Sequence, residues 1–291
     1  MTSSSPSERF VVRDGVRLRC HDWGGSGTDV LLLHGLAGHA GEWDALARLL
    51  RDSGHRVVAL DQRGHGGSER RPGDVSRAAY VADAVAVVGG LGLRRPVLVG
   101  QSLGGSTALL TAAAHPGLPR ALVLVEAGPG GAGPGVQEQI GAWLRAWPVP
   151  FPSREAAATY LGGGRQPVGE GWARGLEERA DGLWPRFDPD VMVRSLDENA
   201  ARDFWDEWTA VSCPVLAVLG QGDQGGIIGG EEYAEMVRLR PGLRGAGVPG
   251  TGHDLHLEQP EVLHRLIVGF LGDSGSADPS VSSCLGVHSN S

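Results

Sequence analysis

The sequence predicts an α/β fold with a mostly parallel central sheet and helices on both of its faces. Short apolar runs, typical of buried strands, alternate with longer segments whose apolar residues recur at helical spacing. Such alternation implies crossover connections and therefore parallel strands. The alternation stops near residue 127 and resumes near residue 213, which indicates one core interrupted by an insertion.

The elements before the insertion follow a regular order. Segments 10–12 and 16–23 flank the turn pair Asp14-Gly15 and indicate a β-hairpin, and the all-apolar run 30–33 indicates a buried strand. The remaining elements of this half are a helix at 41–53, a strand at 56–60, a helix at 75–90, a strand at 96–99, a helix at 103–115 and a strand at 121–125. In folds of this class ligands bind at the carboxyl ends of the strands.

The insertion, residues 127–212, begins with a Gly/Pro-rich stretch and continues with several helical patterns, so we expect an inserted helical cap. It contains six of the eight tryptophans: Trp143, Trp147, Trp172, Trp184, Trp205 and Trp208. The predicted core comprises 9–126 and 213–271, the second part with strands at 214–219 and 243–248 and helices at 231–239 and 260–271. The Ser/Gly-rich tails 1–8 and 272–291 are expected to be flexible.

The composition limits the kinds of molecule that the protein is expected to bind. The net charge is −8, and no block of basic residues could follow a phosphate backbone, so a small-molecule partner is favoured over nucleic acid. No apolar run approaches the roughly 18 residues of a membrane helix. The three cysteines, Cys20, Cys213 and Cys284, show neither metal-ligand nor CxxC spacing, which favours a reducing, cytoplasmic location. No metal or nucleotide motif is present, so no metal or other cofactor is expected.

The strongest chemical signal is Gly100-Gln101-Ser102-Leu103-Gly104, which follows an apolar strand and precedes an Ala/Leu-rich helix. This pattern matches G-x-S-x-G in the strand–turn–helix setting that exposes a serine hydroxyl above the sheet. The flanking glycines allow strand and helix to approach closely. A second element, His34-Gly35-Leu36, follows the strand at 30–33. Together, these two sequence elements predict that Ser102 is a nucleophilic serine.

Four segments resemble the α/β-hydrolase family, and the resemblance extends over nearly all of the chain outside the tails. The segments are HGLAG at 34–38, DQRGHGGS at 61–68, GQSLGG at 100–105 and GHDLHLEQPE at 252–261. The resemblance implies that the backbone N–H groups of Leu36 and Leu103 form an oxyanion hole and that His253 is the general base. It assigns the DQRGHG segment a structural role.

Two residues compete to be the acid that orients His253. Asp223 follows the strand at 214–219 within Gly220-Gln221-Gly222-Asp223, which matches the family's usual acid position. Its flanking sequence, QGGIIGG, departs from the family pattern. Glu126, at the end of the strand at 121–125, is the alternative, because some family members use an acid from that strand.

These residues predict two-step acyl transfer, in which an acyl-enzyme on Ser102 is hydrolysed by a water that His253 activates. We expect a carboxylic ester or lactone of a largely apolar small molecule. Carbon–carbon bond hydrolysis, biosynthetic cyclisation or acyl transfer by the same triad, and a non-catalytic binding role are the alternatives. Five residues around the predicted site are expected to contact the substrate: His34, Gln101, Trp143, Trp147 and Trp184.

Overall fold

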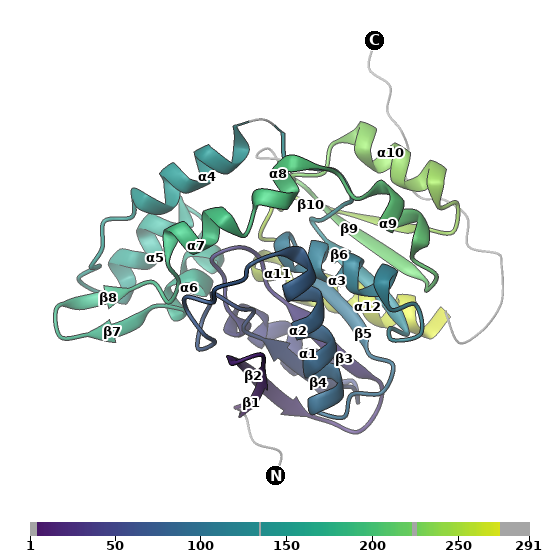
Figure 1. Ribbon diagram of the computed structural model, residues 1–291, viewed down its shortest axis with the longest axis horizontal. Helices are drawn as coiled ribbons and strands as arrows, with labels where there is room; N and C mark the ends of the chain where they lie inside the picture. Colours follow the sequence, from purple (N-terminus) through teal and green to yellow (C-terminus); the bar gives the residue numbers. More distant parts are fainter. Residues whose placement is uncertain (1–4, 134, 223–225, 274–291) are drawn as a thin grey trace.

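The central sheet has eight strands in the order β1-β2-β4-β3-β5-β6-β9-β10 in the computed structural model, which describes residues 5–133, 135–222 and 226–273 (Figure 1). The strands are β1 (Ser7–Arg13), β2 (Val16–Gly24), β3 (Asp29–Leu33), β4 (Arg56–Leu60), β5 (Val97–Gln101), β6 (Ala121–Val125), β9 (Val215–Gln221) and β10 (Arg244–Pro249). Strands β1 and β2 form an antiparallel hairpin, β2 is antiparallel to β4, and every other neighbouring pair is parallel. The predicted fold class is confirmed.

The predicted ends of the core shift by a few residues. Ser7 and Glu8 were expected in the N-terminal tail, but their backbones pair with β2 as the first residues of β1. At the other end, the last helix continues to Asp273 rather than ending at residue 271. In both places the hydrogen bonding of a regular element extends past the point where the apolar pattern fades.

Helices cover both faces of the sheet (Figure 1). Helices α1 (Asp44–Asp52) and α12 (Pro260–Asp273) pack on one face, and α2 (Arg77–Gly90), α3 (Leu103–Ala114) and α10 (Gly230–Leu239) on the other. Two short helices, η1 (Ala40–Trp43) and α11 (Leu255–Glu258), follow strands at the carboxyl edge. The apolar strands β3, β5 and β6 are buried along their whole length, as expected for parallel strands covered on both faces.

The inserted segment forms a helical layer at the carboxyl edge of the sheet, on the left in Figure 1. Its elements are α4 (Val136–Arg145), α5 (Arg154–Gly162), α6 (Gln166–Arg174), the hairpin β7 (Glu177–Arg179) and β8 (Gly182–Trp184), α7 (Pro189–Arg194) and α8 (Asp197–Ala201). Helix α9 (Trp205–Ala210) also lies within the range expected for the cap, but it packs against α3 and buries Trp208 in the core.

Candidate active site

Ser102 sits in the sharp turn between β5 and α3. Its backbone angles, φ 51° and ψ −118°, are ones that a residue with a side chain rarely adopts, so the turn is strained and is held by its surroundings. The glycines on either side permit that strain, because a Cβ on Gly100 would lie 2.2 Å from the carbonyl oxygen of Gly104. A Cβ on Gly104 would lie 2.2 Å from the Leu33 carbonyl oxygen. Only glycine fits either position.

The loop at 34–38 lies directly against this turn. A Cβ placed on Gly35 would come within 3.5 Å of the Ser102 Cβ and 2.1 Å of the Gln101 side-chain oxygen. Leu36 follows Gly35, and Leu103 is the first residue of α3, where backbone N–H groups have no partner within the helix. Among the described residues neither of these two N–H groups donates to a protein acceptor. Their role as an oxyanion hole remains a prediction.

His253 lies next to the nucleophile turn and contacts it through Gln101. The Gln101 side-chain amide donates to the His253 carbonyl oxygen at 3.0 Å and to its ring Nε2 at 3.1 Å. Because Nε2 accepts this hydrogen bond, the ring carries its hydrogen on Nδ1, the tautomer that a general base needs. Gln101 is buried and positions His253, and the substrate contact expected for its side chain remains a prediction. No residue of the described ranges hydrogen-bonds to Nδ1.

Glu126 is the described carboxylate closest to His253, with 3.8 Å between its Oε2 and the ring Nδ1. That distance is too long for a hydrogen bond. The Glu126 oxygens instead accept backbone N–H groups from Gly220 and Ile227, each at 2.6 Å. Fully buried, Glu126 therefore joins the two ends of the segment between β9 and α10.

Asp223 belongs to that segment but falls outside the described residues. Gly222, which precedes it, donates its backbone N–H to the Thr251 carbonyl oxygen at 2.8 Å, and a Cβ on Gly220 would lie 2.5 Å from the Gly252 carbonyl oxygen. The end of β9 thus lies against the residues that precede His253. Both candidate acids remain predictions.

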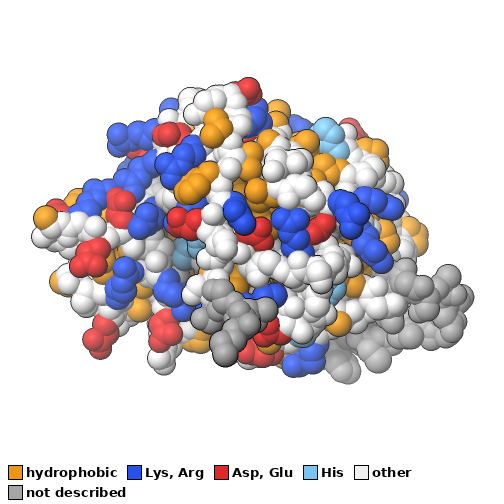
Figure 2. Space-filling model, turned by 90° about the horizontal axis from the view of Figure 1, so that it is seen from below, with side chains coloured by type: hydrophobic (Ala, Val, Ile, Leu, Met, Phe, Trp, Pro, Cys, Tyr) orange, Lys and Arg blue, Asp and Glu red, His pale blue; other side chains and the backbone are white. Residues whose placement is uncertain are grey.

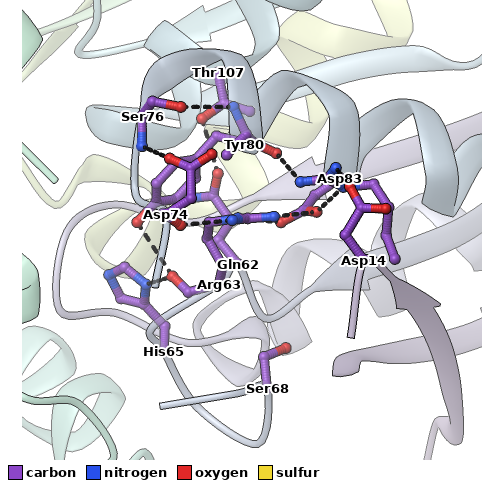
Figure 3. Close-up of polar contacts among 12 residues, drawn as sticks. Asp14, Gln62, Arg63, His65, Ser68, Asp74, Ser76, Tyr80, Asp83 and Thr107 are labelled. Carbon is purple, nitrogen blue, oxygen red and sulfur yellow. Dashed lines mark hydrogen bonds and ion pairs between the residues drawn. The ribbon is translucent and has the colours of Figure 1, made fainter. Parts of the chain in front are cut away.

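The segment at 61–68 forms a buried polar network beneath the site (Figure 3). The Arg63 guanidinium binds both carboxylate oxygens of Asp83, at 2.6 and 2.7 Å, and donates to the Asp74 carbonyl oxygen. Asp61 accepts from Arg19 and from the backbone N–H groups of Ala40 and Gly67. These contacts hold together the loops that follow β4 and β3.

His34 and His65 are both fully buried and neutral. Burial lowers the pKa of His34 to about 4 and that of His65 to about 3. In His34, Nδ1 donates to the Gly35 carbonyl oxygen and Nε2 accepts the Gln62 backbone N–H. Since backbone groups occupy both ring nitrogens, His34 stabilises the loop, and the substrate contact expected for its ring remains a prediction.

Gln62 and Thr107 are positioning residues that sequence reasoning did not single out. The Gln62 amide donates to the His34 carbonyl oxygen at 2.7 Å and accepts from the Thr107 hydroxyl at 2.9 Å. Thr107 lies on α3, one turn after Leu103, so this pair fixes the loop at 34–38 relative to the nucleophile helix. The DQRGHG resemblance marked the region, but only the fold brings Thr107 to it.

Three of the six tryptophans in the range predicted for the cap pack with one another. Trp143, Trp147 and Trp172 form edge-to-face contacts with ring centroids 5.4–5.9 Å apart, and Trp147 is buried in the cap's own apolar cluster. Trp184 lies on the β7–β8 hairpin, where it contacts Arg179 and Asp181. The substrate contacts expected for Trp143, Trp147 and Trp184 remain predictions.

Two cap residues do reach the site. Ile140 of α4 and Leu196, next to α8, pack in one apolar cluster with Leu36 and Leu103. The cap therefore packs against the two residues that are predicted to form the oxyanion hole. The described residues contain no group of three or more His, Cys, Asp or Glu that could hold a metal ion. None of their helices is long and apolar enough to cross a membrane.

A strained serine turn with a histidine and two unpaired N–H groups beside it is the arrangement typical of serine hydrolases. The sequence model of the alpha/beta hydrolase family matches residues 30–266, and the chain belongs to this family of enzymes.

Several known proteins resemble most of the chain. It is 30% identical to the sn-1-specific diacylglycerol lipase ABHD11 of Mus musculus over 83% of this chain and 80% of that protein. It is 32% identical to the N-formylmaleamate deformylase of Pseudomonas putida, over 84% and 88% of the two chains. Among solved structures, E-2-(acetamidomethylene)succinate hydrolase superposes with a TM-score of 0.83 at 25% identity, covering 92% of this chain and 99% of its own.

Proposed function

We propose that the protein hydrolyses a carboxylic ester or lactone of a largely apolar small molecule through an acyl-enzyme on Ser102. The observation that carries the proposal is the strained Ser102 turn, packed against the loop at 34–38 and joined through Gln101 to His253. The relative named as a lipase supports the bond type, as does an esterase of Mycobacterium tuberculosis that is 31% identical over 86% of this chain and 84% of that protein. The Leu36, Leu103, Ile140 and Leu196 cluster supports an apolar substrate.

In the proposed reaction, Nε2 of His253 takes the proton of the Ser102 hydroxyl as its oxygen attacks the carbonyl carbon. The Gln101 amide occupies Nε2 in the free protein, so this hydrogen bond has to yield when Ser102 and substrate engage the ring. The N–H groups of Leu36 and Leu103 stabilise the oxyanion, a contribution of roughly 3–4 kcal/mol per donor. The alcohol then leaves with the proton from His253. A water molecule gives a proton to His253 as it attacks the acyl-enzyme, and Ser102 leaves with that proton.

We further propose Asp223 as the acid that receives the Nδ1–H of His253. Two facts support Asp223 over Glu126: both Glu126 oxygens already accept short backbone hydrogen bonds, and Gly222 is joined to the strand end just before His253. Asp223→Asn should lower kcat by about 10⁴-fold, as expected when the tautomer is no longer fixed. Glu126→Gln is the matched comparison, and a loss of that size in Glu126→Gln alone would make Glu126 the acid.

The test of the serine mechanism is labelling by a fluorophosphonate probe together with turnover of a short-chain p-nitrophenyl ester and a δ-lactone. We expect the wild type to be labelled once and both Ser102→Ala and His253→Ala to be inactive. Turnover that persists in Ser102→Ala would refute the acyl-enzyme. Cleavage of a β-diketone with no ester turnover would favour carbon–carbon hydrolysis. Transfer to an added alcohol in preference to water would favour the acyl-transfer alternative. The cytoplasmic location stays a prediction.

A further inference from the structure

A cavity of about 350 Å³ lies at the junction of the cap and the core, and we call it the junction cavity. The cavity is lined by residues of the core (Arg19, His21, His39, Gly41 and Asp44) and by residues of the cap (Arg154, Arg174, Gly175 and Arg186). Four arginines therefore line one space in a protein whose net charge is −8. Figure 2 shows basic side chains (blue) on both halves of this face of the molecule, with acidic side chains (red) among them.

The arginines of this cavity differ in how far they are neutralised. Arg19 is engaged by Asp61 and Glu8. Among the described residues, no carboxylate lies within 4 Å of Arg154, Arg174 or Arg186, and Arg154 makes one hydrogen bond, to the Ala173 carbonyl oxygen. The remaining carboxylate lining the cavity is Asp44. Three cap arginines against one aspartate leave a surplus of two positive charges.

Two histidines, His21 and His39, also line the cavity. His21 is largely buried, its Nδ1 lies 4.0 Å from Asp44, and that nitrogen has no hydrogen-bond partner among the described residues. His39 is committed to the fold, because its Nδ1 accepts the Gly41 N–H and its Nε2 contacts the Gly171 carbonyl oxygen of the cap. His39 thus forms a fixed wall between core and cap.

We propose that the junction cavity binds a phosphate group, either free phosphate or the end of a phosphorylated small molecule. A phosphate monoester carries a charge of about −1.5 to −2 at pH 7, which matches the surplus of two positive charges. Guanidinium forks bind phosphate oxygens bidentately, and arginines from separate segments can surround a tetrahedral group. A lone carboxylate would leave part of the positive charge uncompensated.

The position of the cavity indicates what a bound phosphate does. A second, much smaller cavity shares His39, Gly175 and Arg186 with it and continues to Ala37 and Gly38 of the loop at 34–38. A phosphate in the junction cavity therefore bridges β2 to the cap next to the loop that carries Leu36. Binding stabilises the packing of cap on core at this edge. This site does not depend on the reaction proposed for Ser102.

The experiment is isothermal titration of the full chain with inorganic phosphate and, separately, with glycerol 3-phosphate, against sodium chloride at matched ionic strength. We expect saturable binding of at least one phosphate compound and a rise in Tm that saturates with it. Arg174→Gln/Arg186→Gln should weaken binding at least tenfold. The matched control, Arg145→Gln/Arg194→Gln, removes the same charge from exposed cap positions outside the cavity and should stay within twofold of wild type.

Absence of saturable binding up to 10 mM of either compound, or equal weakening in the two double variants, would overturn the proposal. The two compounds distinguish free phosphate from a phosphorylated small molecule as the ligand. Equal affinity for both compounds identifies free phosphate, and a preference of tenfold or more for the ester identifies a phosphorylated molecule. Fluorophosphonate labelling of Ser102 should be unchanged in Arg174→Gln/Arg186→Gln. A failure of the phosphate site is therefore distinguishable from a failure of the hydrolase mechanism.

Discussion

Replacing Asp83 by leucine tests whether the network beneath the site holds the structure together. The Arg63 and Asp83 side chains are only 1% and 2% exposed, and they pair through two hydrogen bonds. Asp83→Leu leaves the Arg63 charge buried without a carboxylate, a change that costs about 3–5 kcal/mol. With an unfolding entropy of about 2.1 cal/mol/K per residue over 291 residues, Tm should fall by roughly 5–8 °C.

The assay is urea and thermal unfolding followed by circular dichroism, with Asp14→Asn as the control. Asp14 also pairs with Arg13 but is 81% exposed, so its loss should change the free energy of unfolding by less than about 0.5 kcal/mol. Arg63→Met/Asp83→Leu removes both buried charges and should recover much of the stability, while Arg13, which is 22% exposed, can turn to water. A loss under about 1 kcal/mol in Asp83→Leu, or no recovery in the double variant, would refute the reasoning.

Two further predictions concern the nucleophile turn and the buried histidines. Gly104→Ala puts a Cβ 2.2 Å from the Leu33 carbonyl oxygen and should abolish esterase activity, whereas Gly89→Ala, in open space on α2, should leave activity unchanged and raise stability by about 0.5–1 kcal/mol; equal activities in the two variants would contradict this. Since the pKa values of His34 and His65 lie below the unfolded value of about 6.5, the unfolded chain binds more protons in acid. The contribution of the two histidines to the free energy of unfolding is present above about pH 6.5 and is lost toward pH 4. The loss is about 2 kcal/mol per histidine between pH 7.5 and 5. Urea unfolding midpoints at those two pH values measure this loss of stability. The His65→Asn variant should lose less stability than the wild type between pH 7.5 and 5. An equal loss in the variant and the wild type would argue against buried neutral histidines.

The sequence alone determined the fold class and the position of the nucleophile. Buried parallel strands must be almost wholly apolar, so short apolar runs in the sequence predicted β3, β5 and β6. The G-x-S-x-G pattern predicts a nucleophile only where it lies between such a strand and a helix. These signals are local. The family resemblance then pointed to His253, and the sequence left Asp223 and Glu126 in competition.

Tertiary structure decided how distant residues meet. Gln101 reaches His253 across 152 positions, and Gln62 joins the loop at 34–38 to Thr107 on α3, contacts that no local pattern encodes. Only the packed fold determines which side chains are buried. Burial keeps His34 neutral, and the fold brings two backbone N–H donors to Glu126. The arginines of the junction cavity likewise come from separate segments of cap and core, and their charges add only because the chain folds them around one space.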